Sequence, residues 1–254
     1  MKPYYESEYG KLYFGDCLEI MPSLQEKVEL VLTDPPYGTT QCKWDSVIPF
    51  DKMWGAITSC LSINGCVVLF GQGTATARMI LSNEQKFKYK IVWVKSKATN
   101  FLNAKKQPLR KHEDICVFYD SKPVYIPQMT EGEPYNKGVR KDQQTGAYGE
   151  FRPAYIKSEG SRYPTDVIYF KTAESEGTVF HSTQKPVALM EYLIRTYTNF
   201  GDAVLDFTIG SGTTAVAAVN AGRKFIGIEK EEKYCEIAKQ RIIEAEEKMK
   251  EFEI

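Results

Sequence analysis

The chain has 254 residues, of which 43% are hydrophobic, and its 33 lysines and arginines equal its 33 aspartates and glutamates. This length suits one α/β domain with a small insertion and needs no second full domain. Because the net charge is zero, overall positive charge of the protein cannot attract a nucleic acid. Any nucleic acid must therefore bind a local basic surface.

Cysteine and histidine usage argues against a metal site. The six cysteines form no C-x-x-C pair and the chain has only two histidines, so structural zinc is not expected. Unpaired thiols fit a reducing compartment. The start at Met1–Glu6 has no apolar targeting core, and no run reaches transmembrane length. We therefore expect a cytoplasmic protein with no metal and no membrane partner.

The first predicted elements are a strand at Lys11–Phe14 and a helix at Cys17–Leu24. Asp16 thus stands at the carboxyl end of a strand. Such ends line the ligand crevice of an open α/β sheet, so Asp16 could accept a hydrogen bond from the adenine amino group of a cofactor. The alternative is that Asp16 caps the helix.

The most informative segment follows the second predicted strand. The apolar run Val28–Leu32 ends before Pro35 and Pro36, which cannot donate ladder hydrogen bonds. Residues before proline are held extended, so Asp34 and the Pro35 carbonyl form a stiff pair of acceptors that suits an amino group. Tyr37 adds a flat face on which a nucleobase can stack. The alternative is a Pro-Pro turn that caps a core strand.

The middle of the chain continues the alternation of strands and helices, which favours a mostly parallel sheet. The predicted helices are Asp51–Leu61 and Thr74–Ser82, and the predicted strands are Cys66–Gly71, Ile91–Val94 and Ile115–Tyr119.

The regular spacing of apolar residues is lost between Asp120 and Asp166, where tyrosines are interspersed with basic residues such as Arg140, Lys141 and Arg152. Basic and aromatic residues in a long insertion suit phosphate contact and base reading. The alternative is a mobile surface loop with ordinary solvated charges.

A nucleotide-binding half is predicted near the end of the chain. An apolar strand from Ala203 breaks into the glycine turn at Gly210 and Gly212, and a helix follows at 215–221. A further strand, Lys224–Glu229, ends in an acid placed to bind ribose hydroxyls, before a helix at about 231–250. Two alternatives remain, an NAD-dependent oxidoreductase, whose dinucleotide fingerprint the glycines also fit, and a solvated acid at Glu229.

The glycine turn that usually follows the first strand of this fold comes here at Gly210. We infer a circular permutation, with strand 11–14 beside strand 224–229. The predicted fold is α/β, a doubly wound, mostly parallel, seven-stranded Rossmann-like sheet with a small inserted region. Its three parts are 1–119, the insertion 120–166, and 167–254.

Together these motifs resemble the S-adenosylmethionine-dependent DNA amino-methyltransferases of the permuted class, in which the catalytic motif precedes the cofactor motif. The matching segments are Asp34–Tyr37 (catalytic), Asp206–Thr214 (cofactor loop), His181–Pro186 (a motif before the next helix) and Glu229 (ribose acid). The chain departs from the family at Asp206-Phe207-Thr208, where Asp-Pro-Phe is common.

The resemblance implies methylation of the N6 amino group of adenine in DNA, by base flipping and direct transfer. Aspartate at position 34 favours adenine, and cytosine-N4 methylation is the alternative within this chemistry. A DNA-binding module without enzymatic activity is the alternative from another class. The implied partner is double-stranded DNA, and the resemblance leaves open a cognate restriction endonuclease and a homodimer.

The expected site residues fall into three groups. The expected catalytic residues are Asp34, Pro35, Pro36 and Tyr37. The expected cofactor-binding residues are Asp16, Cys17, Asp34, His181, Thr183, Lys185, Asp206, Phe207, Thr208, Gly210, Gly212, Thr213, Thr214, Glu229 and Lys230. The expected DNA-binding residues are Lys43, Trp44, Arg110, Lys111, His112, Arg140, Lys141 and Arg152.

Overall fold

The computed structural model describes residues 1–38, 46–140, 154–181 and 183–252. The chain divides into unit 1, formed by Met1–Ile126 and Asp166–Ile254, and unit 2, formed by Pro127–Thr165. None of the helices in the described part of the chain is long and apolar enough to span a membrane.

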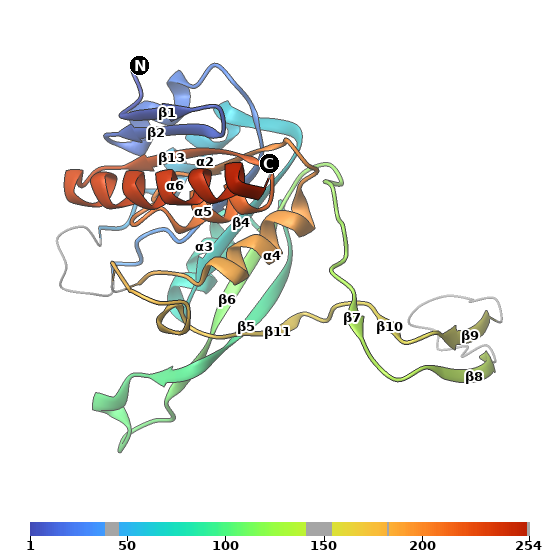
Figure 1. The fold of residues 1–254 in the computed structure, drawn as a ribbon. Coiled ribbons are helices and arrows are strands. Elements are labelled where there is room, and N and C mark those ends of the chain that lie inside the picture. Colours follow the sequence, from blue (N-terminus) through green and yellow to red (C-terminus); the bar gives the residue numbers. More distant parts are fainter. Residues whose placement is uncertain (39–45, 141–153, 182, 253–254) are drawn as a thin grey trace. The chain divides into compact units, whose positions relative to one another are not determined.

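Unit 1 is built on a nine-stranded sheet in the order β1-β2-β13-β12-β3-β4-β6-β5-β11. Figure 1 labels most of these strands. The seven strands from β2 to β5 in this order correspond to the predicted ones, and β1 and β11 are the two outermost strands of the sheet. The bounds are β1 Tyr5–Ser7, β2 Gly10–Phe14, β3 Val28–Thr33, β4 Leu61–Gly71, β5 Phe87–Thr99, β6 Arg110–Phe118, β11 Val167–Phe170, β12 Ala203–Asp206 and β13 Lys224–Glu229.

Helices cover both faces of this sheet, as the doubly wound fold requires. The central strand β3 shows why, because Leu30 packs into one buried cluster and its neighbour Val31 into the other. The first cluster is closed by α4 (Val187–Tyr197), α5 (Thr213–Asn220) and α6 (Glu232–Phe252), and the second by α1 (Cys17–Ile20), α2 (Phe50–Cys60) and α3 (Thr74–Ser82).

The permuted topology is confirmed by the strand pairing. Strand β2 pairs in parallel with β13, so that Phe14 lies opposite Glu229. Strand β12 pairs in parallel with both β13 and β3. The carboxyl ends of β2, β13, β12 and β3 therefore meet at one edge, which we call the carboxyl edge, and this edge carries the acids predicted at strand ends.

Strands β5 and β6 differ most from expectation. Strand β6 is antiparallel to both of its neighbours, β4 and β5. Both strands also extend beyond the predicted Ile91–Val94 and Ile115–Tyr119, because they continue as a hairpin that leaves the sheet (Figure 1). The extension was not predicted because it carries mostly polar residues.

Unit 2 contains two short antiparallel pairs, β7 (Thr130–Glu131) with β10 (Ser161–Arg162) and β8 (Tyr135–Arg140) with β9 (Ala154–Ser158). None of its described residues is buried. Residues 120–126, expected in the insertion, belong to unit 1, where the amide of Ile126 donates to the Thr196 carbonyl at 2.8 Å.

Candidate active site

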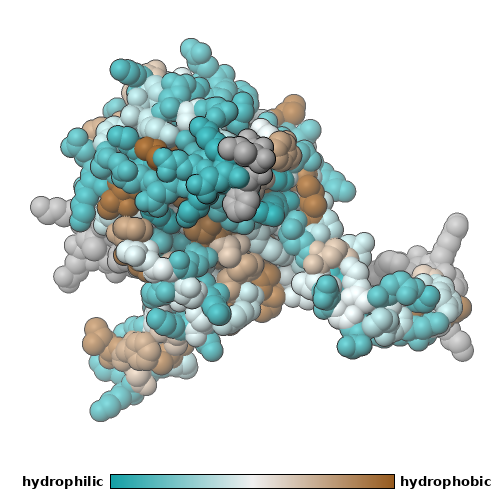
Figure 2. All heavy atoms as spheres, viewed as in Figure 1, coloured by the Kyte–Doolittle hydropathy of each residue, from teal (hydrophilic) through white to brown (hydrophobic). Residues whose placement is uncertain are grey.

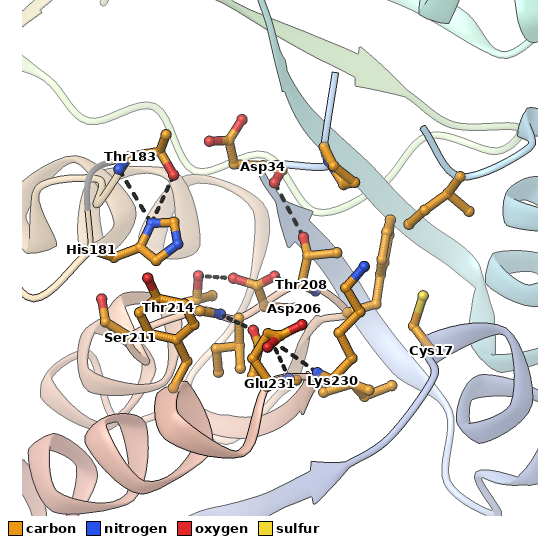
Figure 3. A pocket seen from close by; sticks show the side chains of 18 of the residues that line it. Cys17, Asp34, His181, Thr183, Asp206, Thr208, Ser211, Thr214, Lys230 and Glu231 are labelled. Carbon is orange, nitrogen blue, oxygen red and sulfur yellow. Dashed lines mark hydrogen bonds between the residues drawn. The ribbon is translucent and has the colours of Figure 1, made fainter. Parts of the chain in front are cut away.

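A cavity of about 250 Å³ lies at the carboxyl edge of the sheet (Figure 3). Of the expected cofactor-binding residues, Gly212 alone does not line it. Those that do are Asp16, Cys17, Asp34, His181, Thr183, Lys185, Asp206, Phe207, Thr208, Gly210, Thr213, Thr214, Glu229 and Lys230.

The cofactor loop is organised around the buried carboxylate of Asp206, which ends β12. This carboxylate accepts hydrogen bonds from the Thr33 hydroxyl at 2.6 Å, from the Thr208 amide at 3.1 Å and from the Thr214 hydroxyl. Burial raises the pKa of Asp206 to about 6, and these donors oppose the rise. Asp206 thus fixes the loop to β3 and to the start of α5.

Glu229, at the end of β13, is also buried rather than solvated. Its carboxylate accepts hydrogen bonds from the backbone amides of Gly210 at 2.8 Å, Lys230 at 2.9 Å and Glu231 at 2.9 Å. Burial raises the pKa of this carboxyl, and the amides oppose the rise. Glu229 therefore shapes the glycine turn and faces the cavity.

Asp16 caps a helix and also lies at the cavity. Its side chain accepts from the Leu18 amide at 2.8 Å, which makes it the N-cap of α1. It also lines the cavity. Across the cavity, His181 accepts from the Thr183 amide at 3.2 Å and packs edge-on against Tyr234, with ring centroids 4.5 Å apart.

Thr208 connects the cofactor loop to the Asp-Pro-Pro-Tyr corner (Figure 3). Its hydroxyl donates to the Asp34 carbonyl at 3.2 Å and lies 2.6 Å from the Thr33 hydroxyl. Thr208 belongs to the segment where the sequence departs from the family's Asp-Pro-Phe. The departure thus supplies a polar link between the two motifs.

The Asp34 carboxylate accepts hydrogen bonds from two side chains of unit 1. One oxygen accepts from the Tyr37 hydroxyl, and the other accepts from the Lys185 ammonium. Lys185 was expected in the cofactor group, and Tyr37 was expected to offer its ring. The structure adds a polar role for each of them at Asp34.

The charge network extends to two residues that were not among the expected site residues. The Lys185 ammonium lies 3.4 Å from an oxygen of Glu113, and the other Glu113 oxygen binds the ammonium of Lys95 at 3.0 Å. Glu113 belongs to β6 and Lys95 to β5. The antiparallel course of β6 brings its amino end to the carboxyl edge, and the sequence pattern gave no signal of this reversal.

The protonation of this network is set by burial and mutual attraction. Burial raises the pKa of Asp34, the Lys185 ammonium opposes the rise, and Glu113 reinforces it. Burial alone would lower the pKa of Lys185, but Asp34 and Glu113 raise it well above its usual range. Burial also disfavours the Glu113 carboxylate, yet Lys185 and Lys95 hold its pKa below the usual value. The Lys185 ammonium therefore favours the ionised form of both neighbouring acids, Asp34 and Glu113.

The remaining expected residues lie elsewhere. Pro35 and Tyr37 line a second cavity of about 100 Å³, and Pro36 lines both cavities. Arg110, Lys111 and His112 are exposed at the start of β6. The residues Lys43, Trp44, Lys141 and Arg152, and the side chain of Arg140, lie outside the described part of the structure.

Comparison with known proteins decides the family. Residues 28–240 match the family model described as DNA methylase, of the N6 and N4 type. The chain belongs to this DNA methylase family. Like its family, this DNA methylase uses S-adenosylmethionine as its methyl donor.

Individual relatives agree with this assignment. The DNA methylase is 26% identical to the type II methyltransferase M2.LlaDCHI of Lactococcus lactis subsp. cremoris, over 95% of this chain and 92% of the relative. It is also 26% identical to the DNA adenine methyltransferase YhdJ of Escherichia coli (strain K12), over 93% and 83% of the two chains.

Solved structures share the fold. The complex of M1.HpyAVI with S-adenosylmethionine superposes with a TM-score of 0.65 at 26% identity, covering 91% of this chain and 98% of the other. The cytosine-N4-specific PvuII DNA methyltransferase gives a TM-score of 0.68 at 18% identity, covering 94% and 88%. The shared fold therefore does not choose between adenine and cytosine as the target base.

Proposed function

We propose that this DNA methylase transfers a methyl group to the N6 amino group of adenine at specific sites in double-stranded DNA. The observation that carries the proposal is the bond from Thr208 to the Asp34 carbonyl, because it holds the acceptor corner beside the cofactor loop. The likeness to a DNA adenine methyltransferase over 93% of the chain supports the choice of adenine.

The cavity suits the cofactor. Two acids, Asp16 and Glu229, line it beside the buried apolar side chains Phe207 and Ile228, a combination that fits ribose hydroxyls and an adenine ring. When bound, S-adenosylmethionine supplies an electrophilic methyl group on a sulfonium.

Gly210 has a φ of 53°, and a Cβ added there would meet no atom within 4 Å. The turn therefore leaves room for close approach of a ligand to the backbone.

Asp34 would prepare the target nitrogen. The lone pair of an adenine amine is delocalised into the ring, so the amine is a poor nucleophile. Hydrogen bonds from the amine to Asp34 and to the Pro35 carbonyl localise that lone pair and stabilise the positive charge that develops on nitrogen. Holding the amine beside the methyl donor also supplies the orientation that direct displacement needs.

Both oxygens of Asp34 already accept a hydrogen bond, from Tyr37 and from Lys185. The target amine must therefore displace or share one of these donors. The neighbouring Glu113 oxygen, 3.4 Å from Lys185, has no hydrogen-bond partner among the described residues and offers the ammonium a second position. Lys185 would thus favour the ionised form of Asp34 before the base arrives.

Unit 2 is proposed as the target-recognition region, since its described residues are all at least partly exposed and its strands carry basic and aromatic side chains. The name type II methyltransferase among the relatives supports a place in a restriction-modification pair with a cognate endonuclease. A homodimer stays a prediction from the resemblance alone.

The test is sequencing of genomic DNA from a methylation-deficient bacterial host that expresses the protein. We expect N6-methyladenine at one sequence motif, with the modified nucleoside identified by mass spectrometry. The Asp34→Ala variant should give no methylation while binding S-adenosylmethionine with near-normal affinity in calorimetry. N4-methylcytosine at the motif would instead establish the alternative specificity, and wild-type methylation by Asp34→Ala would contradict the mechanism.

A further inference from the structure

A hairpin arm leaves unit 1 at the carboxyl edge of the sheet. We define the hairpin arm as residues 96–112, which comprise the end of β5, the connection 100–109 and the start of β6. Strand β6 is antiparallel to β4 and to β5, so β5 runs in the same direction as β4 and β3 and ends at the same edge as Asp34. Figure 1 shows this hairpin projecting from the rest of the sheet.

The hairpin arm is strongly basic within a chain of zero net charge. Residues 96–112 contain no aspartate or glutamate. Among the salt bridges of the described residues, none involves a cation of the arm. These exposed cations are Lys97, Lys105, Lys106, Arg110 and Lys111. Such a local basic surface on a neutral protein fits a polyanion.

The tip of the hairpin arm is apolar. Phe101 is 68% exposed and Leu102 is 100% exposed, and Figure 2 shows a hydrophobic surface at the end of the arm. A wholly exposed leucine beside an exposed phenylalanine, surrounded by cations, is the pattern of a side-chain pair that becomes buried against a partner.

The tip also has a fixed local shape. Asn100 adopts a left-handed backbone with a φ of 73°, and its side chain accepts from the Asn103 amide group at 2.8 Å. The Asn103 backbone amide donates to the Asn100 carbonyl, and the Ala104 amide to the Phe101 carbonyl, both at 3.0 Å. These bonds present Phe101 and Leu102 in a preorganised turn, which lowers the entropic cost of binding.

The base of the hairpin arm is joined to the active site. Arg110 donates to the side chain of Gln72 at 2.9 Å, and Gln72 donates to the His112 carbonyl at 3.4 Å. The next residue, Glu113, contacts Lys185, which binds Asp34. The arm is therefore held in a defined position relative to the catalytic carboxylate.

We propose that the hairpin arm is a DNA wedge, whose cations contact phosphates while Phe101 and Leu102 insert between base pairs next to the target base. The proposal rests on the proposed function and adds a means of unstacking the base. Apolar side chains inserted at a base step partly unstack it, and backbone contacts set their register. The cations favour DNA over an apolar protein surface.

The test compares two duplex oligonucleotides that carry the motif found by sequencing, one fully paired and one with a mismatch opposite the target base. A mismatched base is easier to extrude. We expect Phe101→Ser/Leu102→Ser to slow single-turnover methylation of the paired duplex about tenfold or more, and of the mismatched duplex by less than about threefold. Melting temperature and affinity for S-adenosylmethionine should match wild type.

The matched control is Ile63→Ser, because Ile63 is 87% exposed and lies near the amino end of β4, at the opposite edge of the sheet. This control should methylate both duplexes at the wild-type rate. Equal losses on the two duplexes for the tip variant, or no loss on the paired one, would overturn the wedge while leaving the methyltransferase assignment intact. Absence of methylation by the wild-type protein would instead overturn the proposed function.

The phosphate contacts are tested separately with Lys105→Gln/Lys106→Gln. This variant should weaken binding to both duplexes alike and reduce the slope of log affinity against log salt concentration by up to about 2. An unchanged slope would remove these lysines from the DNA interface and overturn that half of the proposal.

Discussion

At the scale of single residues, Lys185 is the cation that favours an ionised Asp34 at the proposed catalytic centre. Burial raises the pKa of Asp34, and the Lys185 ammonium is the attraction that opposes this rise. A protonated Asp34 would lose part of its capacity to accept from the target amine. Activity should therefore fall as the pH decreases through the pKa of Asp34.

Replacing Lys185 tests this dependence. In Lys185→Met, burial acts on Asp34 without the opposing cation, so the acidic limb of kcat/KM should move up by roughly 1–3 pH units. Lys185→Arg is the matched control, since it keeps the positive charge, and its acidic limb should stay near the wild-type pH. A Met variant with an unshifted limb would show that Lys185 does not set the pKa of Asp34.

Replacing Glu113 should shift the acidic limb of the kcat/KM profile in the opposite direction. Its carboxylate reinforces the raised pKa of Asp34, so Glu113→Gln should lower that pKa and move the acidic limb to lower pH. The measurement is the same kcat/KM profile, with folding verified by thermal denaturation. A limb that moves upward would mean that loss of Glu113 displaces Lys185 from Asp34.

Glu229 should matter for both binding and structure. Because its carboxylate orients the amides of Gly210, Lys230 and Glu231, Glu229→Ala should weaken affinity for S-adenosylmethionine about tenfold or more in calorimetry. The exposed Glu232, at the start of α6, provides the control Glu232→Ala, which should bind normally. Unchanged affinity in Glu229→Ala would exclude it from the cofactor site.

At the scale of elements, the glycine turn before α5 performs two different tasks. Gly210 and Gly212 both have positive φ angles, 53° and 86°. A Cβ at Gly210 meets no atom within 4 Å, whereas one at Gly212 would lie 2.9 Å from the Cα of Ala238 in α6. Gly210 therefore faces the cavity and Gly212 allows helix α6 to approach the turn.

This difference predicts unequal effects of alanine on stability. Gly210→Ala should cost roughly 1–2 kcal/mol of unfolding free energy, from the left-handed backbone alone. Gly212→Ala should cost about 1–3 kcal/mol more, because overlap with Ala238 is added to that strain. Urea denaturation without cofactor measures both, and equal losses would show that α6 shifts freely.

The sequence predicts the elements that its side chains bury. The seven central strands are apolar runs, and the acids at their carboxyl ends follow from the parallel arrangement. The outer part of β5 carries residues such as Lys97 and Thr99, which contact no core and therefore leave no apolar signal. Glu113 was not among the expected site residues for a related reason, since its place at the site depends on the reversed direction of β6, which only pairing in the sheet determines.

At the scale of the whole molecule, the two chain segments at the base of unit 2 lie side by side and could be joined directly. The Gly132 amide donates to the Gly160 carbonyl at 2.7 Å, and Glu131 pairs with Ser161. The chain therefore returns to its starting point around the β8–β9 pair, which has no buried residue among its described residues. Removal of this pair should leave the core of unit 1 complete.

We predict that deletion of residues 134–158, with Gly132 and Gly160 joined by the remaining short turn, leaves the melting temperature and affinity for S-adenosylmethionine near wild type. Methylation at the specific motif should be lost, because base recognition is proposed for the deleted part. Sequencing of genomic DNA from expressing cells checks this prediction. Retained methylation at the same motif would move recognition to unit 1.

The position of β12 and β13 between β2 and β3 has a consequence for biosynthesis. The ribosome releases β2 and β3 early, yet the strands that separate them are made after every other described strand. The growing chain therefore holds two unpaired strand edges through most of translation, and such edges are prone to aggregate. Completion of the sheet must await β12 and β13, so the nascent chain should stay prone to aggregation until these two strands are made.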